Sequence, residues 1–66
     1  MKLYRITIIT PTQNLDRGVW ASSVDIDGSH IIFIDESDDI VAAFPSNITM
    51  ITSIETKEQY EARKSK

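Results

Sequence analysis

Hydrophobic and polar residues alternate along most of the first 54 positions, which is the pattern of β-strands with one buried face. Isoleucine also outnumbers leucine by eleven to two, and β-branched side chains favour strands over helices. The segment 11–18 is rich in turn-forming residues, so we expect a long loop there. The pattern predicts five strands, at positions 2–10, 19–27, 29–35, 40–45 and 48–54.

A hairpin is predicted between the second and third of these strands. Asp27-Gly28 is a favoured pair for the two central positions of a type I′ turn, where both residues need a positive φ. A turn at these residues places Asp25 opposite His30. A turn one residue later, at Gly28-Ser29, is the alternative.

The apolar faces of the predicted strands define one core. The run 31–34 is apolar on both faces, which is typical of a central strand covered on two sides, inside a barrel or beneath a partner subunit. An acidic turn after this run pairs Phe33 with Ala42 in the next strand. The expected core residues are Tyr4, Ile6, Ile8, Trp20, Val24, Ile26, Ile31, Phe33, Ile40, Phe44, Ile48 and Met50.

Residues 55–66 form a charged tail after a β domain of residues 1–54. Thr56 and Gln59 match the capping-box pattern that opens many helices, and good helix formers follow them. Tyr60 and Ala62 are the tail's only apolar residues, so the helix has little surface to bury. We expect a short or frayed helix.

The segment Phe44-Pro45-Ser46-Asn47-Ile48 resembles the connection between the last two strands of SH3 domains. The resemblance covers these five residues and implies a small, partly open SH3-like barrel. A single five-stranded antiparallel sheet is the other arrangement that the strand pattern allows. The resemblance implies no binding of proline-rich peptides, because such a groove needs several clustered aromatic residues and this chain has few.

Acidic residues concentrate in the middle of the chain, whose net charge is −3. The residues before the tail include only three cationic side chains, those of Lys2, Arg5 and Arg17, which disfavours direct binding of nucleic acid. An acidic surface instead suits a basic protein partner. Trp20 is either a core residue or an exposed anchor at the interface. The candidate partner-binding residues are Asp25, Asp27, Asp35, Glu36, Asp38, Asp39 and Trp20.

Asp25-x-Asp27-Gly28 resembles part of an EF-hand loop, which would bind calcium. That loop needs a bidentate glutamate six residues after the glycine, where this chain has Ile34, and Ser23 replaces the first aspartate. A hairpin turn explains the segment better, and we predict no metal site.

His30 is the only histidine, and the chain has no cysteine, so no usual zinc site can form within one chain. The predicted hairpin brings four possible catalytic partners near His30: Ser22, Ser23, Ser29 and Asp25. An open strand surface, however, offers no pocket and no oxyanion donors. We therefore predict no catalytic residues, no cofactor and no enzyme activity.

The N-terminal residues alternate in polarity, so they match neither a signal peptide nor a membrane span. We expect a cytoplasmic protein. A 66-residue chain without disulfides buries little surface, which makes a homo-oligomer plausible.

The leading functional hypothesis is a non-catalytic protein-interaction module, a small regulator or inhibitor that docks on a larger protein through its acidic surface. One alternative is a homo-oligomeric protein that binds a small molecule in a pocket between subunits. The other is a purely structural subunit.

Overall fold

The computed structural model describes residues 1–65 as six β-strands followed by one short helix. The strands form two antiparallel three-stranded sheets: sheet A has the order β2-β1-β6, and sheet B has the order β3-β4-β5. The elements are β1 (Lys2–Ile9), β2 (Asn14–Ala21), β3 (Ser23–Asp27), β4 (His30–Ile34), β5 (Ile40–Pro45), β6 (Thr49–Thr56) and α1 (Lys57–Lys64). The mostly β class is confirmed, but there are six strands in two sheets rather than five in one, and the sheets do not close into a barrel.

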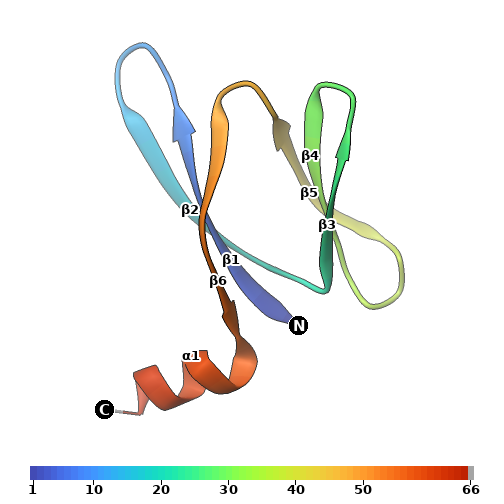
Figure 1. Ribbon diagram of the computed structural model, residues 1–66, viewed down its shortest axis with the longest axis vertical. Coiled ribbons are helices and arrows are strands. Elements are labelled where there is room, and N and C mark those ends of the chain that lie inside the picture. The colour runs from blue at the N-terminus through green and yellow to red at the C-terminus, as the bar shows by residue number, and fades with distance from the viewer. Residues whose placement is uncertain (66) are drawn as a thin grey trace.

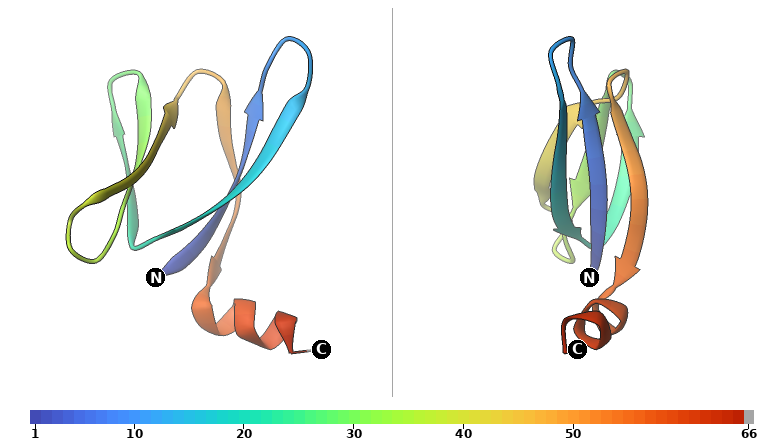
Figure 2. Two further views of the ribbon diagram at one scale, coloured as in Figure 1. Left: turned by 180° about the vertical axis from the view of Figure 1, so that it is seen from behind. Right: turned by 90° about the vertical axis from the view of Figure 1, so that its left-hand side faces the viewer.

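The two sheets face each other, with β3 and β6 along one side of the stack and β2 and β5 along the other (Figures 1 and 2). The helix lies beyond the end of sheet A, near the N-terminus (Figure 1). The radius of gyration is 12.6 Å, whereas a compact chain of this length has about 11 Å. The molecule is therefore more open than a typical small domain.

The predicted loop at 11–18 is wrong, because Asn14–Ala21 forms strand β2 and pairs with β1 along its whole length. A tight turn joins the two strands, and the Thr10 N–H donates to the Gln13 carbonyl oxygen at 3.0 Å. Gly18 signals a turn in the sequence but lies within β2. A Cβ at this position would stand 3.3 Å from Leu3 Cδ1, so the glycine makes room for a buried leucine.

The predicted strand 19–27 is two strands that belong to different sheets. The chain changes sheets at Ser22, whose N–H donates to the Ile34 carbonyl oxygen at 2.8 Å. Ala21 and Val24 both pack into the core, although residues three apart in one continuous strand point to opposite faces. The break at Ser22 resolves this conflict and turns Trp20 away from the core.

The β3–β4 hairpin has the alternative turn, at Gly28-Ser29. Asp27 pairs with His30, so the predicted turn at Asp27-Gly28 and the predicted pairing of Asp25 with His30 are wrong. The observed register needs a positive φ at Gly28, 60°, and at no other residue of the hairpin. It also pairs apolar Ile26 with Ile31 and Val24 with Phe33. Between β4 and β5 the predicted pairing of Phe33 with Ala42 is confirmed.

The core lies between the two sheets. Tyr4 and Ile6 of sheet A and Ile31 and Phe33 of sheet B are buried, as predicted. The Tyr4 ring meets the Phe33 ring edge-to-face at 5.3 Å, which ties the sheets together. Predicted members that are only partly buried are Ile8, Val24, Phe44 and Ile48.

Four predicted core residues are exposed: Trp20, Ile26, Ile40 and Met50. Ile26 faces the core side of sheet B but lies on its edge strand β3, which leaves it 69% exposed. The other three lie on the outer faces of their sheets. Three buried residues were missed by the sequence pattern: Leu3, Ala21 and Thr49.

A β-bulge in β6 explains the error at Met50. The pairing with β1 shifts between Arg5 and Ile6, which leaves Thr52 without a cross-strand partner, and the Thr52 hydroxyl donates to the Arg5 carbonyl oxygen at 3.2 Å. The extra residue allows Ile51 and Ile54 to face the same side of sheet A. Met50 then lies on the opposite side, on the outer face.

The predicted helix forms as α1, and its capping box is confirmed. The Thr56 hydroxyl accepts from the Gln59 N–H at 3.1 Å, and the Gln59 side chain accepts from the Thr56 N–H at 2.9 Å. Its aromatic residue Tyr60 packs edge-to-face on Trp20, with ring centroids 5.0 Å apart. Within residues 1–65, no helix is long and apolar enough to cross a membrane.

Candidate docking surface

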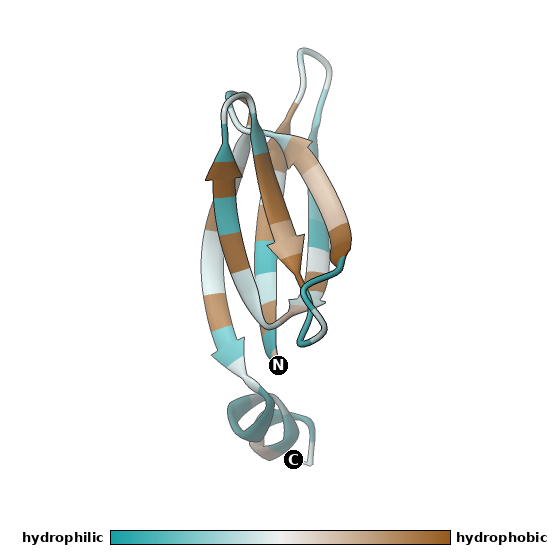
Figure 3. Cartoon of the chain, turned by 90° about the vertical axis from the view of Figure 1, so that its right-hand side faces the viewer, coloured by the Kyte–Doolittle hydropathy of each residue, from teal (hydrophilic) through white to brown (hydrophobic). Residues whose placement is uncertain are grey.

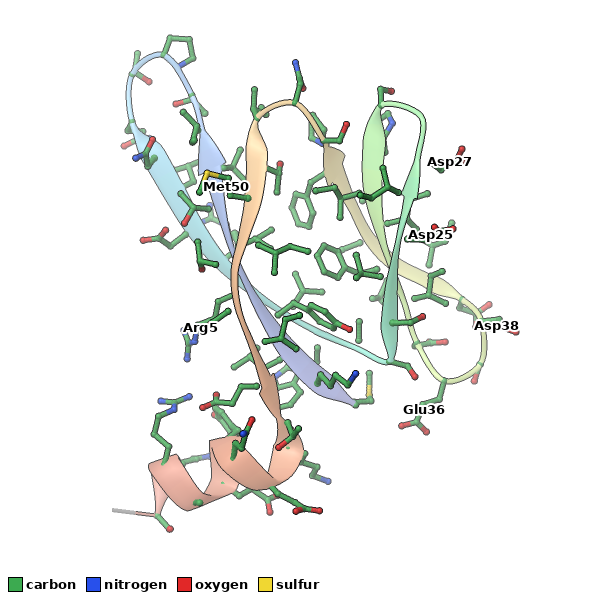
Figure 4. All side chains as sticks on the ribbon, viewed as in Figure 1. Arg5, Asp25, Asp27, Glu36, Asp38 and Met50 are labelled. Atoms are coloured by element: carbon green, nitrogen blue, oxygen red, sulfur yellow. The ribbon has the colours of Figure 1, made fainter. Side chains whose placement is uncertain are left out.

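The acidic side chains of the predicted site lie on the side of the molecule formed by sheet B (Figure 4). Asp25 and Asp27 belong to the edge strand β3, and both are exposed. They share the outer face of sheet B because their cross-strand partners are Ile32 and His30 rather than the buried Ile31 and Phe33. The strand pairing of sheet B therefore brings these two carboxylates together on its outer face.

Asp25 also protects the free edge of sheet B. Its Oδ1 accepts from the Ile26 N–H at 2.9 Å. Unpaired backbone groups on an edge strand invite pairing with another chain, and charged side chains discourage it. The second oxygen of Asp25 stays available for a partner.

The β4–β5 loop carries the other four carboxylates, and Asp35 organises it. The Asp35 Oδ1 accepts from the Ser37 N–H at 2.8 Å and from the Asp39 N–H at 3.0 Å. Asp38 has a φ of 64°, in the left-handed region that aspartate tolerates better than most residues. The half-buried Asp35 thus holds the loop, while Glu36, Asp38 and Asp39 are exposed.

The acidic surface has few cations near it. Among residues 1–65, its one ion pair joins Glu36 Oε1 to the Met1 amino group at 3.6 Å. Arg5 projects from the opposite side of the molecule, beyond sheet A (Figure 4). Asp25, Asp27 and Asp38 on the side of sheet B therefore have no Lys or Arg ion-pair partner among residues 1–65.

Trp20 lies apart from Asp25 and Asp27 but shares a groove with Glu36. The groove has a volume of about 390 Å³ and is open to solvent. Trp20 and Tyr60 supply its aromatic walls, and the indole is 37% exposed. The lining residues are Met1, Trp20, Glu36, Lys57, Tyr60 and Glu61.

The groove adds no net charge to the acidic surface. Its carboxylates, Glu36 and Glu61, are matched by Lys57 and the Met1 amino group. The helix residues of the groove were absent from the predicted site. A signal existed, because the capping box at Thr56 predicted the helix and Tyr60 is its one large apolar residue.

A bidentate ion pair fixes the helix to sheet A. Arg63 Nε and Nη2 donate to the two carboxylate oxygens of Glu55 at 3.0 and 2.9 Å. These hydrogen bonds, with the nearby positive charge, lower the pKa of Glu55 and raise the pKa of Arg63. The Arg63 guanidinium also lies 5.2 Å from the Tyr60 ring centroid. The pair orients α1 and so shapes the groove.

Ser29 and His30 are the only neighbouring pair that resembles catalytic chemistry within the described residues. The Ser29 Oγ lies 3.1 Å from His30 Nδ1. Both residues are exposed at the hairpin turn, away from the groove. No group of three or more His, Asp or Glu side chains in residues 1–65 is arranged to hold a metal ion.

Comparison with known proteins supplies no relative from which a function could be transferred. No family model matches the chain, and neither does any curated protein or solved structure. The proposals that follow rest on the positions, charges and contacts of these residues.

Proposed function

We propose that this protein is a non-catalytic interaction module, a small regulator or inhibitor that docks on a larger protein with a basic surface. The supporting observation is the placement of exposed carboxylates on one side of the molecule. Asp25, Asp27 and Asp38 lie on the side of sheet B, and no Lys or Arg side chain of residues 1–65 pairs with them.

Unpaired carboxylates on one side attract a basic partner over long distances. Such complementarity mainly raises the association rate, and added salt weakens it. Arg5 on the opposite side gives the molecule a charge asymmetry that favours one orientation during the encounter. Glu36 and Trp20 in the groove provide a charged and an aromatic contact beside this surface.

The test compares two variants with the same net charge. In the first, Asp25 and Asp27 are replaced by Asn. In the second, the matched control, Asp16→Asn is combined with Glu58→Gln, away from sheet B and outside the groove. The partner recovered by affinity capture from native cells is purified, and its association rate with each variant is measured against salt.

We expect the first variant to associate several-fold (about three- to tenfold) more slowly at low salt and to show a weaker dependence of its association rate on salt. The control should stay close to the natural protein. Equal rates for both variants would refute docking through the acidic surface.

A second function, a homo-oligomer that binds a small molecule between subunits, has its own supporting observation. Ile26 of β3 and Ile51 and Ile54 of β6 face inward from edge strands on the same side of the stack. They remain 69%, 37% and 54% exposed. A native mass that stays monomeric at all concentrations would remove this candidate. An oligomer that carries no added mass would instead indicate a structural subunit.

A further inference from the structure

The outer face of sheet B forms a regular array of side chains. The strand register places Asp25, Ile32 and Ala43 in one row across the sheet. The next row toward the β4–β5 loop contains Ser23, Ile34 and Ile40. In these two rows, strand β3 therefore contributes polar side chains at one border of the face. Strands β4 and β5 contribute apolar side chains at its centre and at the opposite border.

No element of residues 1–65 covers this face. The helix lies at sheet A, and the side view of sheet B shows its strands uncovered (Figures 1 and 3). Hydrophobic residues run without interruption along β4 after His30 (Figure 3). Ile32 and Ile34 are half-buried by their neighbours alone, and Ile40 is 65% exposed. A central strand that is apolar on both faces is normally covered on both.

Carboxylates border this apolar face on two sides. Asp25 and Asp27 line the β3 border, and Asp38 extends from the loop beyond Ile34. A partner that covers the apolar centre would bring cations to these borders, because no Lys or Arg side chain of residues 1–65 forms an ion pair with these three carboxylates.

The dimensions of the face indicate which kind of secondary-structure element can cover it. Strands β3 and β5 lie about 10 Å apart, and a five-residue strand is about 17 Å long. These dimensions match one α-helix, which is about 10 Å wide and rises 1.5 Å per residue, over about three turns. They fall short of the roughly 800 Å² per partner of a stable protein–protein interface. A second copy of the chain that packed through the same face would bring its own Asp25 and Asp27 there, not cations.

We propose that the outer face of sheet B seats one amphipathic helix of the partner, with its apolar stripe on Ile32, Ile34 and Ile40 and its Lys or Arg residues toward Asp25 and Asp27. The inference rests on the proposed docking function and names the part of the partner that is bound. The apolar contact slows dissociation of the partner helix, and the bordering carboxylates orient it on the sheet.

The test uses three synthetic 14-residue peptides as probes. One has a leucine stripe flanked by lysines, one has the same stripe flanked by glutamates, and one has the lysines with serine in place of leucine. Binding is followed by amide chemical shifts of the isotope-labelled protein. The variants are Ile32→Thr combined with Ile34→Thr, Ile32→Thr alone, and Met50→Thr as the control on the outer face of sheet A.

We expect the Leu/Lys peptide to shift the amides of β4 and β5, and the Leu/Glu and Ser/Lys peptides to bind at least about tenfold more weakly. The double variant should lose at least about tenfold in affinity, and Met50→Thr should change little. Threonine suits strands, and the single variant and the amide spectrum show whether the fold is kept.

Several results would overturn this inference. Ser/Lys binding as tight as Leu/Lys binding, or unchanged affinity in the folded double variant, would leave the acidic surface as a docking site without a helix seat. Shifts confined to sheet A, or a peptide-free dimer formed through β4, would show that another occupant or surface is correct. Failure of every lysine peptide to bind would count against both this inference and the docking function.

Discussion

Sheet A and sheet B have three strands each, but the side chains on their outer faces differ in polarity. Sheet A carries polar pairs on its outer face, such as Thr7 with Asp16, whose side chains are joined by a hydrogen bond of 2.8 Å. Its apolar end, at Leu3 and Trp20, is met by Tyr60 of α1. Sheet B has apolar residues at the corresponding positions of β4 and no covering helix.

The two sheets therefore differ in what covers the apolar part of their outer faces. An apolar outer face must be covered, and the chain provides its own helix for sheet A. For sheet B no element of residues 1–65 provides such a cover, and the proposed partner helix would supply it. Substitutions in the core and on each outer face measure how much each region contributes to the free energy of unfolding.

Phe33→Ala should have the largest effect, because this ring joins the two sheets. Phe33 is fully buried and contacts the rings of Tyr4 and Phe44 at centroid distances of 5.3 and 5.9 Å. Its removal leaves a cavity and should cost about 3–5 kcal/mol in the free energy of unfolding by urea. Ile40→Ala on the outer face of sheet B should cost less than about 1 kcal/mol. Similar losses would mean that the core does not lie between the sheets.

Tyr60→Ala tests whether the helix covers sheet A. The ring packs edge-to-face on Trp20, so its loss should cost about 1–2 kcal/mol and expose the indole. Trp20 is the only tryptophan, so its fluorescence reports this change directly. Met50→Ala, on the same outer face but nearer the far end, should leave the fluorescence unchanged. An unaltered spectrum in the Tyr60 variant would contradict the packing of α1 on sheet A.

Thr56→Ala tests whether the helix can unfold while the two sheets stay folded. The hydroxyl caps the first turn of α1, so its loss should cost about 1 kcal/mol. Amide hydrogen exchange should accelerate in residues 57–64 and stay slow in β1 and β4. Thr12→Ala, in the exposed turn between β1 and β2, is the matched control. Faster exchange throughout would show that sheet A depends on the helix for its folding.

Acidification should break the ion pair between Glu55 and Arg63, and its effect on stability should be the smallest of the four changes. The hydrogen bonds from Arg63 lower the pKa of Glu55 in the folded protein, so the pair stabilises fully above the ordinary carboxylate pKa of about 4.5. That stability is lost as the pH falls through the lowered pKa. We expect the melting temperature of the natural protein to fall more below pH 4.5 than that of Glu55→Gln. Parallel curves would exclude a role for the pair.

Much of the fold could be predicted because its signals are local. The capping box at Thr56 predicted α1, and the apolar run 31–34 with the acidic turn after it predicted β4, β5 and the pairing of Phe33 with Ala42. The acidic residues were also predicted as a surface, because carboxylates seldom occupy a core. Their separation from the cations required the structure.

Other features could not be predicted, since they depend on contacts between distant residues. The turn-rich segment before Val19 becomes a strand because β1 offers it a partner. Trp20 faces outward because the chain changes sheets at Ser22 and Tyr60 arrives from the far end of the chain. Asp35 resembled its neighbours in the sequence, yet its carboxylate closes the loop.

The sequence by itself determined that the chain is mostly β, where its helix begins and which segment is acidic, because periodicity, capping and charge are properties of neighbouring residues. Tertiary structure decided which face of each strand is inside. Two bulges, at Thr52 in β6 and at Val41 in β5, and one break at Ser22 reverse the alternation. Only packing against the other sheet fixes where they fall. The same packing left the outer face of sheet B uncovered.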